Sequence, residues 1–134
     1  MRYLAVDLGD KRTGLAAGDD VTRMAGPIGV LQIARGPALV EAVAAAVVEH
    51  AADAIVLGLP VNMDGTEGDR ARIVRAFGAE LVAAAGVTVH YQDERLTSFA
   101  ADQRLARTGR THKEKKMRRD ALAAAEILGD FFAG

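Results

Sequence analysis

The amino-acid sequence predicts an α/β fold, a mixed five-stranded sheet with helices on both faces. The expected elements follow the order βββαβαβαα, in which three strands precede alternating helices and strands. Residues 52–60 form a continuous apolar run that Pro60 closes, which is typical of a strand buried on both faces of a parallel sheet. The 134 residues suit one domain, 1–134, since no repeat or linker divides them.

The first third of the chain predicts a hairpin and a third strand. Residues 2–9 are a short β run ended by Gly9, and β character resumes after "DKR". Residues 2–18 are therefore expected to form a hairpin of two antiparallel strands. The segment "AGPIGVLQI", residues 25–33, predicts the third strand.

Two helices are predicted from their starting residues. Residues 36–50 open with a glycine as a candidate N-cap and with Pro37, which suits the first turn of a helix. After the apolar strand and a loop, Thr66 with Asp69 three residues later resembles a capping box. This pattern predicts a second helix that ends near Ala85.

The last third of the chain predicts a strand and two helices. Residues 86–94, "GVTVHYQDE", predict the fifth strand, and residues 97–107 a helix. A polar loop follows at 108–115, and the final helix is expected over 114–132. Its apolar residues recur at helical spacing and form one amphipathic stripe: Met117, Ala121, Ala124, Leu128 and Phe131.

Composition excludes several classes of protein. The chain has no cysteine, so it has neither disulfides nor a thiolate metal site, which fits a reducing compartment. No signal segment is present, and charged or polar residues such as Glu41, Glu49 and Asp53 interrupt the longest apolar run. A cytoplasmic protein without a membrane span is therefore expected.

Positive charge is concentrated in one segment, although the net charge of the chain is only −1. Residues 104–119 hold eight basic residues and a single acid, so the rest of the chain is net acidic. Such a segment is either a solvated surface or a contact with a polyanion such as nucleic acid. Its basic residues are Arg104, Arg107, Arg110, Lys113, Lys115, Lys116, Arg118 and Arg119.

Acidic residues are expected to converge at one edge of the sheet. In an open α/β sheet, ligands bind at the carboxyl ends of the parallel strands. Asp7 ends the first strand, and Asp93 and Glu94 end the fifth. Asp120 lies on the flank of the apolar stripe of the last helix, near the core.

A hard divalent cation would resolve the repulsion among these carboxylates. Half-buried like charges are unfavourable unless they are neutralised, and Mg²⁺ prefers oxygen ligands. Asp7, Glu94 and Asp120 are the candidate metal ligands, with Asp93 as a further ligand or a supporting group. One or two ions, Mg²⁺ or Mn²⁺, would then be able to promote hydrolysis of a phosphodiester.

Each acid also has an ordinary structural explanation. Asp7 is explained equally well by an ion pair with Lys11 or Arg12 across the hairpin. The two consecutive acids after the fifth strand suit the N-terminal dipole of a helix. Asp120 has Lys116 one helical turn back as a possible partner. The functional interpretation therefore depends on several acids sharing one position in the fold.

Four segments resemble, in order and spacing, the signature blocks of the YqgF family. They are "DLGDKRTGLA", "GLPVNMDGTEG", "DERLTSFAA" and "KKMRRDALAAAEIL". The family comprises bacterial proteins described as Holliday-junction resolvases and as pre-16S rRNA nucleases. The resemblance spans nearly the whole chain and implies an RNase H-like fold with a metal-dependent nuclease centre. It matches Asp7, Glu94 and Asp120 with the three acids of the family's centre.

The combined expectation is a metal-dependent nuclease that acts on structured nucleic acid, either precursor rRNA or a four-way DNA junction. Lys11, Arg12 and Arg95 would hold the scissile phosphate or its neighbours, and the basic segment 104–119 would hold flanking phosphates. Few aromatic residues are present, which disfavours a base-stacking surface. Either a monomer or a homodimer is compatible with the sequence, and paired cuts of a junction would need a dimer.

Two other functions remain possible from the sequence. An actin-like ATPase also holds phosphates on a strand and hairpin, but it needs two such domains and the chain supplies one. An RNase H-like domain that binds RNA or a ribosome without cutting is the main alternative. Metal-dependent cleavage that Asp7→Asn abolishes while binding persists would distinguish a nuclease from such a binder.

Overall fold

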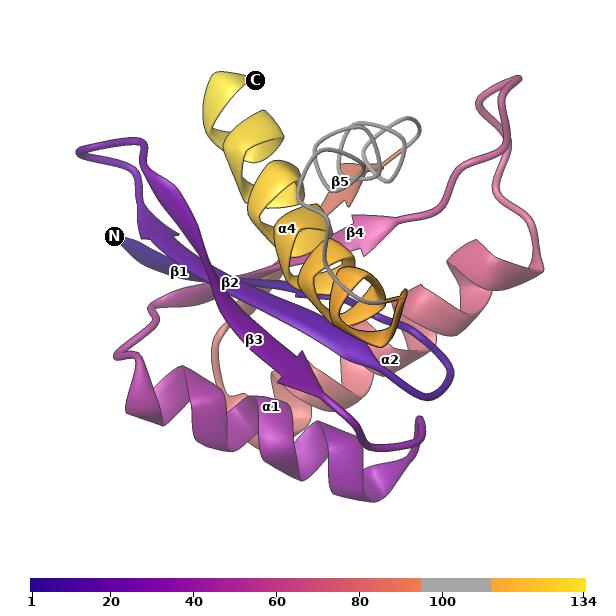
Figure 1. Ribbon diagram of the computed structural model, residues 1–134, viewed down its shortest axis with the longest axis horizontal. Helices are drawn as coiled ribbons and strands as arrows, with labels where there is room; N and C mark the ends of the chain where they lie inside the picture. The colour runs from indigo at the N-terminus through magenta and orange to yellow at the C-terminus, as the bar shows by residue number, and fades with distance from the viewer. Residues whose placement is uncertain (95–111) are drawn as a thin grey trace.

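The computed structural model describes residues 1–94 and 112–134, and only the backbone for residues 112–117. In these ranges, three strands come first and helices and strands then alternate, as Figure 1 shows. The elements are β1 (Arg2–Asp7), β2 (Thr13–Asp19), β3 (Ala25–Leu31), α1 (Pro37–Glu49), β4 (Ala54–Leu59), α2 (Asp69–Ala85), β5 (Thr88–Asp93) and α4 (His112–Ala133).

The strands form one mixed sheet in the order β3-β2-β1-β4-β5. The hairpin partners β1 and β2 are antiparallel, as are β2 and β3. The pairs β1–β4 and β4–β5 are parallel. The carboxyl ends of β1, β4 and β5 therefore meet at one edge, which confirms the expected sheet and its antiparallel second strand.

Helices cover both faces of the sheet, as predicted. In Figure 1, α1 and α2 lie on one face and α4 crosses the other. On the first face, aliphatic side chains of the strands pack against Leu39 and Val43 of α1 and Val74 and Leu81 of α2. On the other face, small strand residues make room for Ala124, Ile127 and Leu128 of α4, together with other side chains of that helix. Every residue of β4 is buried, as its apolar sequence predicts.

The helix α1 packs into the core. Leu39, Val40, Val43, Ala46 and Val47 are buried, whereas the side chain of Val48 is 80% exposed. Gly36 is its N-cap and a proline occupies its first turn, as predicted.

The predicted capping box of the second helix is wrong. The N-cap of α2 is Gly68, without a side-chain cap, and the helix begins at Asp69. Thr66 instead donates its hydroxyl hydrogen to Asp64 Oδ1 at 2.7 Å, and its backbone N–H bonds the same oxygen. An aspartate two residues before Thr66 offers a local turn that competes with the cap.

The final helix is slightly longer than predicted, and its apolar stripe is largely confirmed. Ala121, Ala124 and Leu128 are buried, and Phe131 packs against the same cluster. The side chain of Met117, which the prediction also included, lies outside the described residues, as does the helix predicted over 97–107. In the parts of the chain that the structure describes, no helix is long and apolar enough to cross a membrane.

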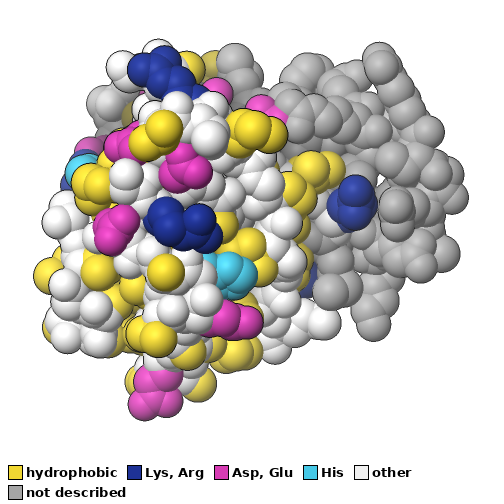
Figure 2. All heavy atoms as spheres, turned by 90° about the vertical axis from the view of Figure 1, so that its left-hand side faces the viewer, with side chains coloured by type: hydrophobic (Ala, Val, Ile, Leu, Met, Phe, Trp, Pro, Cys, Tyr) yellow, Lys and Arg dark blue, Asp and Glu magenta, His cyan; other side chains and the backbone are white. Residues whose placement is uncertain are grey.

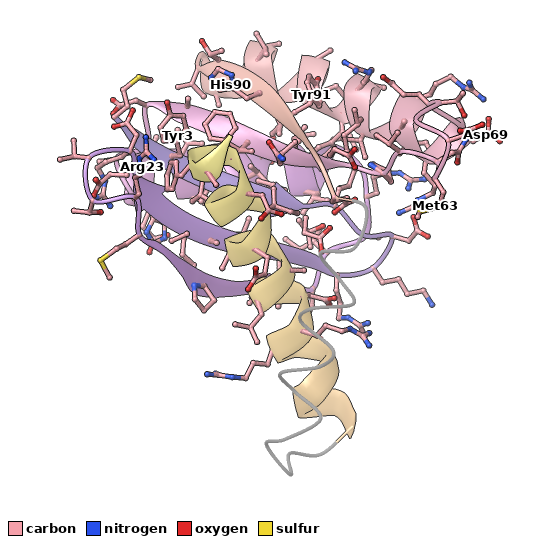
Figure 3. All side chains as sticks on the ribbon, turned by 90° about the horizontal axis from the view of Figure 1, so that it is seen from above. Tyr3, Arg23, Met63, Asp69, His90 and Tyr91 are labelled. Carbon is pink, nitrogen blue, oxygen red and sulfur yellow. The ribbon has the colours of Figure 1, made fainter. Side chains whose placement is uncertain are left out.

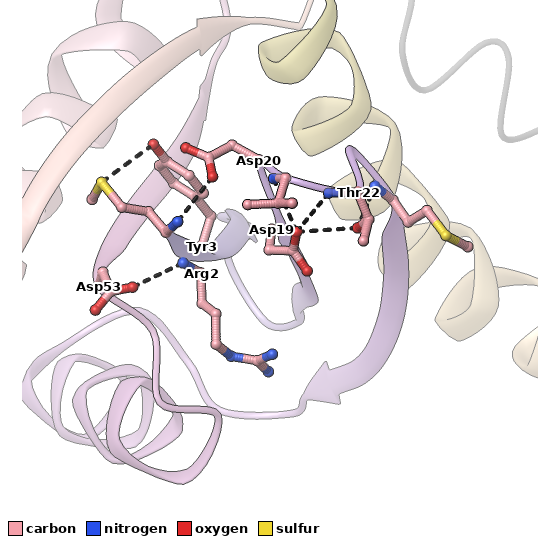
Figure 4. A network of polar contacts seen from close by, with 9 residues as sticks. Arg2, Tyr3, Asp19, Asp20, Thr22 and Asp53 are labelled. Atoms are coloured by element: carbon pink, nitrogen blue, oxygen red, sulfur yellow. Dashed lines mark hydrogen bonds and ion pairs between the residues drawn. The ribbon is translucent and has the colours of Figure 1, made fainter.

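A polar network anchors the start of the chain at the other end of the sheet. Figure 4 shows the N-terminal amine of Met1 paired with Asp20, and Asp53 accepting from the backbone of Arg2. Asp19 accepts bonds from the turn between β2 and β3. These contacts tie the chain start to the loops around it, and they lie away from the carboxyl ends of the parallel strands.

Candidate active site

Asp7 and Glu94 meet at the carboxyl edge of the parallel strands. Asp7 is the last residue of the central strand β1, and Glu94 directly follows β5. The backbone N–H of Glu94 donates to Leu59 O at 3.2 Å, which extends the pairing of β4 and β5 by one residue. Both side chains are half-buried, and they share a hydrogen bond. The structure thus brings together two acids that are far apart in the sequence, as predicted.

The environment disfavours two ionised carboxylates at this position. Burial raises the pKa of Asp7 well above its usual value, and the charges of Glu94 and Asp120 raise it further. Burial also raises the pKa of Glu94, as does the charge of Asp93. The hydrogen bond from Asp7 opposes the shift at Glu94. Because two ionised carboxylates are unfavourable here, a bound cation at this position would be stabilising.

The missing side chain of Gly58 creates space for the Glu94 carboxylate. A Cβ atom on this residue of β4 would lie 2.6 Å from Glu94 Oε2 and 2.5 Å from Ile127 Cδ1. Both contacts are shorter than van der Waals distances allow. This glycine therefore lets the glutamate lie against the sheet beside Asp7.

Asp120 reaches the same edge from α4, across a second glycine. The backbone of α4 passes so close to Gly14 of β2 that a Cβ there would overlap the Asp120 carbonyl group. The carboxylate of Asp120 accepts a hydrogen bond from Arg12 Nε at 2.9 Å, and 20% of its side chain is exposed. Its charge nevertheless acts on Asp7.

The ion pairs expected from the sequence alone are rearranged. Arg12 was an expected partner of Asp7, but it bonds Asp120, while Asp7 bonds Glu94. The side chain of Lys116, the other expected partner of Asp120, lies outside the described residues. The hairpin turn and the last helix are thus joined by one partly buried ion pair.

The acids offer the oxygen donors that a hard divalent cation prefers, although in the described part of the chain they are not arranged as a complete set of metal ligands. In the ranges 1–94 and 118–134, no three acidic or histidine side chains are arranged to hold a metal ion. The Asp120 carboxylate is engaged by Arg12. Asp7 and Glu94 offer adjacent carboxylate oxygens, the donors that Mg²⁺ and Mn²⁺ prefer.

Sequence reasoning missed Arg70 of α2. Its charge lowers the pKa of both Asp7 and Glu94, so it lies close enough to act on the pair. Its guanidinium donates to Asp10 Oδ1 at 3.0 Å. Arg70 is the second residue of α2. Only the fold places the start of this helix beside the end of β1, so no signal in the sequence indicated this contact.

The structure describes few of the side chains that were predicted to contact nucleic acid. Arg118 is exposed on α4, and Arg119 is half-buried and has an interaction partner. The other basic residues predicted to bind phosphates beyond Glu94 lie outside the described side chains; they are Arg95, Arg104, Arg107, Arg110, Lys113, Lys115 and Lys116. Lys11 lies in the turn between β1 and β2.

Other side chains pack against the rings of both tyrosines, Tyr3 and Tyr91. Tyr3 is buried in the cluster beneath α4, where its ring lies 5.3 Å from that of Phe131. The guanidinium of Arg75 covers the ring of Tyr91 at 4.8 Å. Phe99 lies outside the described residues. His90 packs against Tyr3 and Phe131.

Comparison with known proteins finds relatives that match along nearly the whole chain. A curated relative from Anaeromyxobacter sp. (strain Fw109-5), named "Putative pre-16S rRNA nuclease", is 46% identical over 100% of this chain and 98% of its own length. A relative of the same name from Dechloromonas aromatica is 36% identical over 96% of this chain and 88% of its own length.

Solved structures of junction resolvases share the fold. The Thermus thermophilus RuvC complex with a Holliday junction substrate gives a TM-score of 0.56 at 16% identity, over 98% of this chain and 93% of that one. The fowlpox virus resolvase complex with junction DNA gives 0.61 at 12% identity, over 99% and 97%. These likenesses confirm the RNase H-like fold.

The match to a protein family covers the whole chain. Residues 1–134 match the family described as "RuvX: Holliday junction resolvase". The relatives named above match along nearly all of their own lengths. The chain therefore belongs to the RuvX/YqgF family, as the resemblance of its four sequence blocks indicated.

Proposed function

We propose that this chain is a divalent-metal-dependent endonuclease that hydrolyses phosphodiester bonds in structured nucleic acid. The observation that carries the proposal is the half-buried Asp7–Glu94 pair at the sheet edge, with Asp120 close enough to act on it. Family membership supports the same reaction class. The substrate is either precursor 16S rRNA or a Holliday junction, the two substrates named for relatives and for the family.

The chain's own residues have distinct parts in this proposal. Asp7 and Glu94 would hold one or two Mg²⁺ or Mn²⁺ ions, joined by Asp120, with Asp93 as a further ligand or a supporting group behind Glu94. When bound, such an ion supplies Lewis acidity at the phosphate and activates water for attack on phosphorus. Release of Asp120 would free the Arg12 guanidinium at the same edge.

Basic side chains would hold the substrate through its phosphates. Arg12 lies beside the acids, and Lys11 and Arg95 flank them in the sequence. The segment 104–119 would contact phosphates further along the backbone, which gives affinity that depends strongly on salt and little on base sequence. The covered rings of Tyr3 and Tyr91 support recognition of the backbone rather than stacking on bases.

A paired cleavage assay tests this function. The purified chain would be incubated with a labelled four-way DNA junction and with a labelled precursor-rRNA fragment, each in Mg²⁺, Mn²⁺ or EDTA. Asp7→Asn, Glu94→Gln and Asp120→Asn would be compared with Glu41→Gln, a control that removes an exposed acid from α1. The proposal requires cutting that depends on the metal, is lost in the three site variants and persists in the control.

The main alternative is an RNase H-like domain that binds nucleic acid without cutting it. The ion pair between Arg12 and Asp120 favours it, because it engages one of the three acids. Tight, salt-sensitive binding of either substrate without cleavage in any metal would favour this alternative. Light scattering of the complex with a junction would show whether two copies assemble, since paired cuts need a two-fold arrangement.

A further inference from the structure

Arg35 and Arg70 lie together beside the candidate active site, held by one carboxylate. Asp10 Oδ1 accepts from Arg35 Nη1 at 2.7 Å and from Arg70 Nη1 at 3.0 Å. The three residues come from the β1–β2 turn, the loop before α1 and the first turn of α2. They are distant in sequence, so only the fold creates this arginine pair.

The arginine pair lies at the edge of the sheet that carries the acids. Asp10 follows Asp7 by three residues in the turn that leaves β1. The charge of Arg70 acts on Asp7 and on Glu94. Figure 3 shows Asp69, which precedes Arg70, at the end of the molecule opposite Tyr3 and His90. An anion bound to the pair would therefore lie next to the acids.

Both guanidinium groups have donor capacity beyond their contact with Asp10. A guanidinium carries five N–H donors. Among the described residues, each of these two side chains donates only through Nη1, and only to Asp10. The side chains are 37% and 51% exposed for Arg35 and Arg70. Two such forks side by side match the oxygens of a phosphate.

The β1–β2 turn and the loop before α1 are joined even without the Arg35 side chain. The backbone N–H of Arg35 already donates to the backbone carbonyl of Asp10 at 3.2 Å. The guanidinium adds an exposed ion pair, and such pairs contribute little to stability. Asp10 stays ionised, since its bond and attraction to Arg70 lower its pKa. Two cations around one anion leave a net positive charge beside the acids.

We propose that Arg35 and Arg70 form a phosphate-binding site for the nucleic-acid substrate, separate from the scissile position. The occupant is a backbone phosphate near the cleaved bond, and Asp10 holds the two guanidinium groups ready for it. This inference rests on the proposed function for its substrate. The opposite end of the molecule differs: Figure 2 shows the face at the left of Figure 1, where basic and acidic side chains are interspersed.

Binding and cleavage measured separately test the site. Fluorescence anisotropy in EDTA, over a series of salt concentrations, would give the affinity for a labelled four-way junction and for a precursor-rRNA fragment. The variants are Arg35→Gln, Arg70→Gln and the double variant. Arg72→Gln is the matched control, because it removes the same charge from the same helix and its guanidinium pairs with the exposed Asp69.

Each single substitution should weaken binding about three- to tenfold and lower the salt dependence by about one phosphate contact. The double variant should lose more, whereas Arg72→Gln should bind within about twofold of the wild type. At saturating substrate, Arg35→Gln should cleave at the wild-type rate, so that KM rises while kcat is kept. Thermal unfolding of every variant would confirm that the fold is intact. The nucleic acid whose affinity falls, DNA junction or rRNA fragment, is the substrate that places a phosphate between Arg35 and Arg70.

Two results would overturn the inference. One is unchanged affinity in the double variant, and the other is an equal loss in Arg72→Gln, which would mean that general charge rather than this pair matters. Failure of the proposed function is recognised differently, as a wild-type chain that cuts neither substrate. In that case, a selective loss of binding in the double variant would still establish the phosphate site.

Discussion

Gly14→Ala should separate the last helix from the sheet, because α4 contacts β2 at this residue through backbone atoms. An added Cβ would lie 2.5 Å from the Asp120 carbonyl carbon, 3.1 Å from Ala121 N and closer still to the Asp120 carbonyl oxygen. No side-chain rotation can relieve contacts with a helix backbone. The helix would have to shift, and the Asp120 carboxylate would move relative to Arg12.

The expected loss of stability follows from two opposing effects. Overpacking of this kind costs about 1–3 kcal/mol. Alanine restricts the unfolded chain more than glycine does, which returns about 0.4–1 kcal/mol. The net loss should therefore be about 1–2 kcal/mol, which corresponds to a decrease in Tm of about 4–8 °C for a chain of this size.

Thermal and urea unfolding would measure the effect, with Gly29→Ala as the matched control. Gly29 of β3 pairs with Leu15 of β2, and a Cβ added at Gly29 would meet no atom within 4 Å. The control should unfold at or slightly above the wild-type temperature. If Gly14→Ala unfolded at the same temperature as the control, the close approach of α4 to β2 would be refuted.

Further predictions concern the acids and their neighbours. Gly58→Ala should displace the Glu94 carboxylate and abolish most cleavage. Its Tm should fall by only a few degrees, because the new Cβ would meet the ends of the Ile127 and Glu94 side chains, which are able to move. Normal cleavage by this variant would contradict the prediction. The raised pKa of Asp7 means that stability from its protonated form is lost as the pH rises through that pKa. Asp7→Asn, without divalent ions, should therefore raise Tm at neutral pH but not in acid; a lower Tm at neutral pH would be inconsistent with this sign. Mg²⁺ should raise the wild-type Tm more at higher pH, because ions and protons compete for Asp7 and Glu94, and a rise independent of pH would exclude that pair as the ligands. Arg12→Gln should lower stability by about 1 kcal/mol without metal but increase the Tm rise caused by Mg²⁺, and an unaltered Mg²⁺ response would show that Arg12 does not compete for Asp120.

The pattern of residues along the chain determined most of the fold. Strand and helix positions follow from local periodicity, because burial of one face repeats every two or every 3.6 residues. The buried strand β4 and the apolar stripe of α4 were predictable for this reason. The meeting of Asp7 and Glu94 was predictable too, since Asp7 ends β1, Glu94 follows β5, and both strands are parallel to β4 between them.

Only the tertiary structure decided which side chains meet. Arg12 bonds Asp120 instead of Asp7. Arg70 acts on the acids from α2, a helix that was predicted but not expected to contribute to the site. The cap of α2 failed as a prediction because a nearby aspartate competed for Thr66. Long polar side chains reach several partners of opposite charge, and local spacing does not distinguish among them. The partner of each side chain depends on which distant segments the fold brings together, as where the close approach of α4 to Gly14 places Asp120 near Arg12.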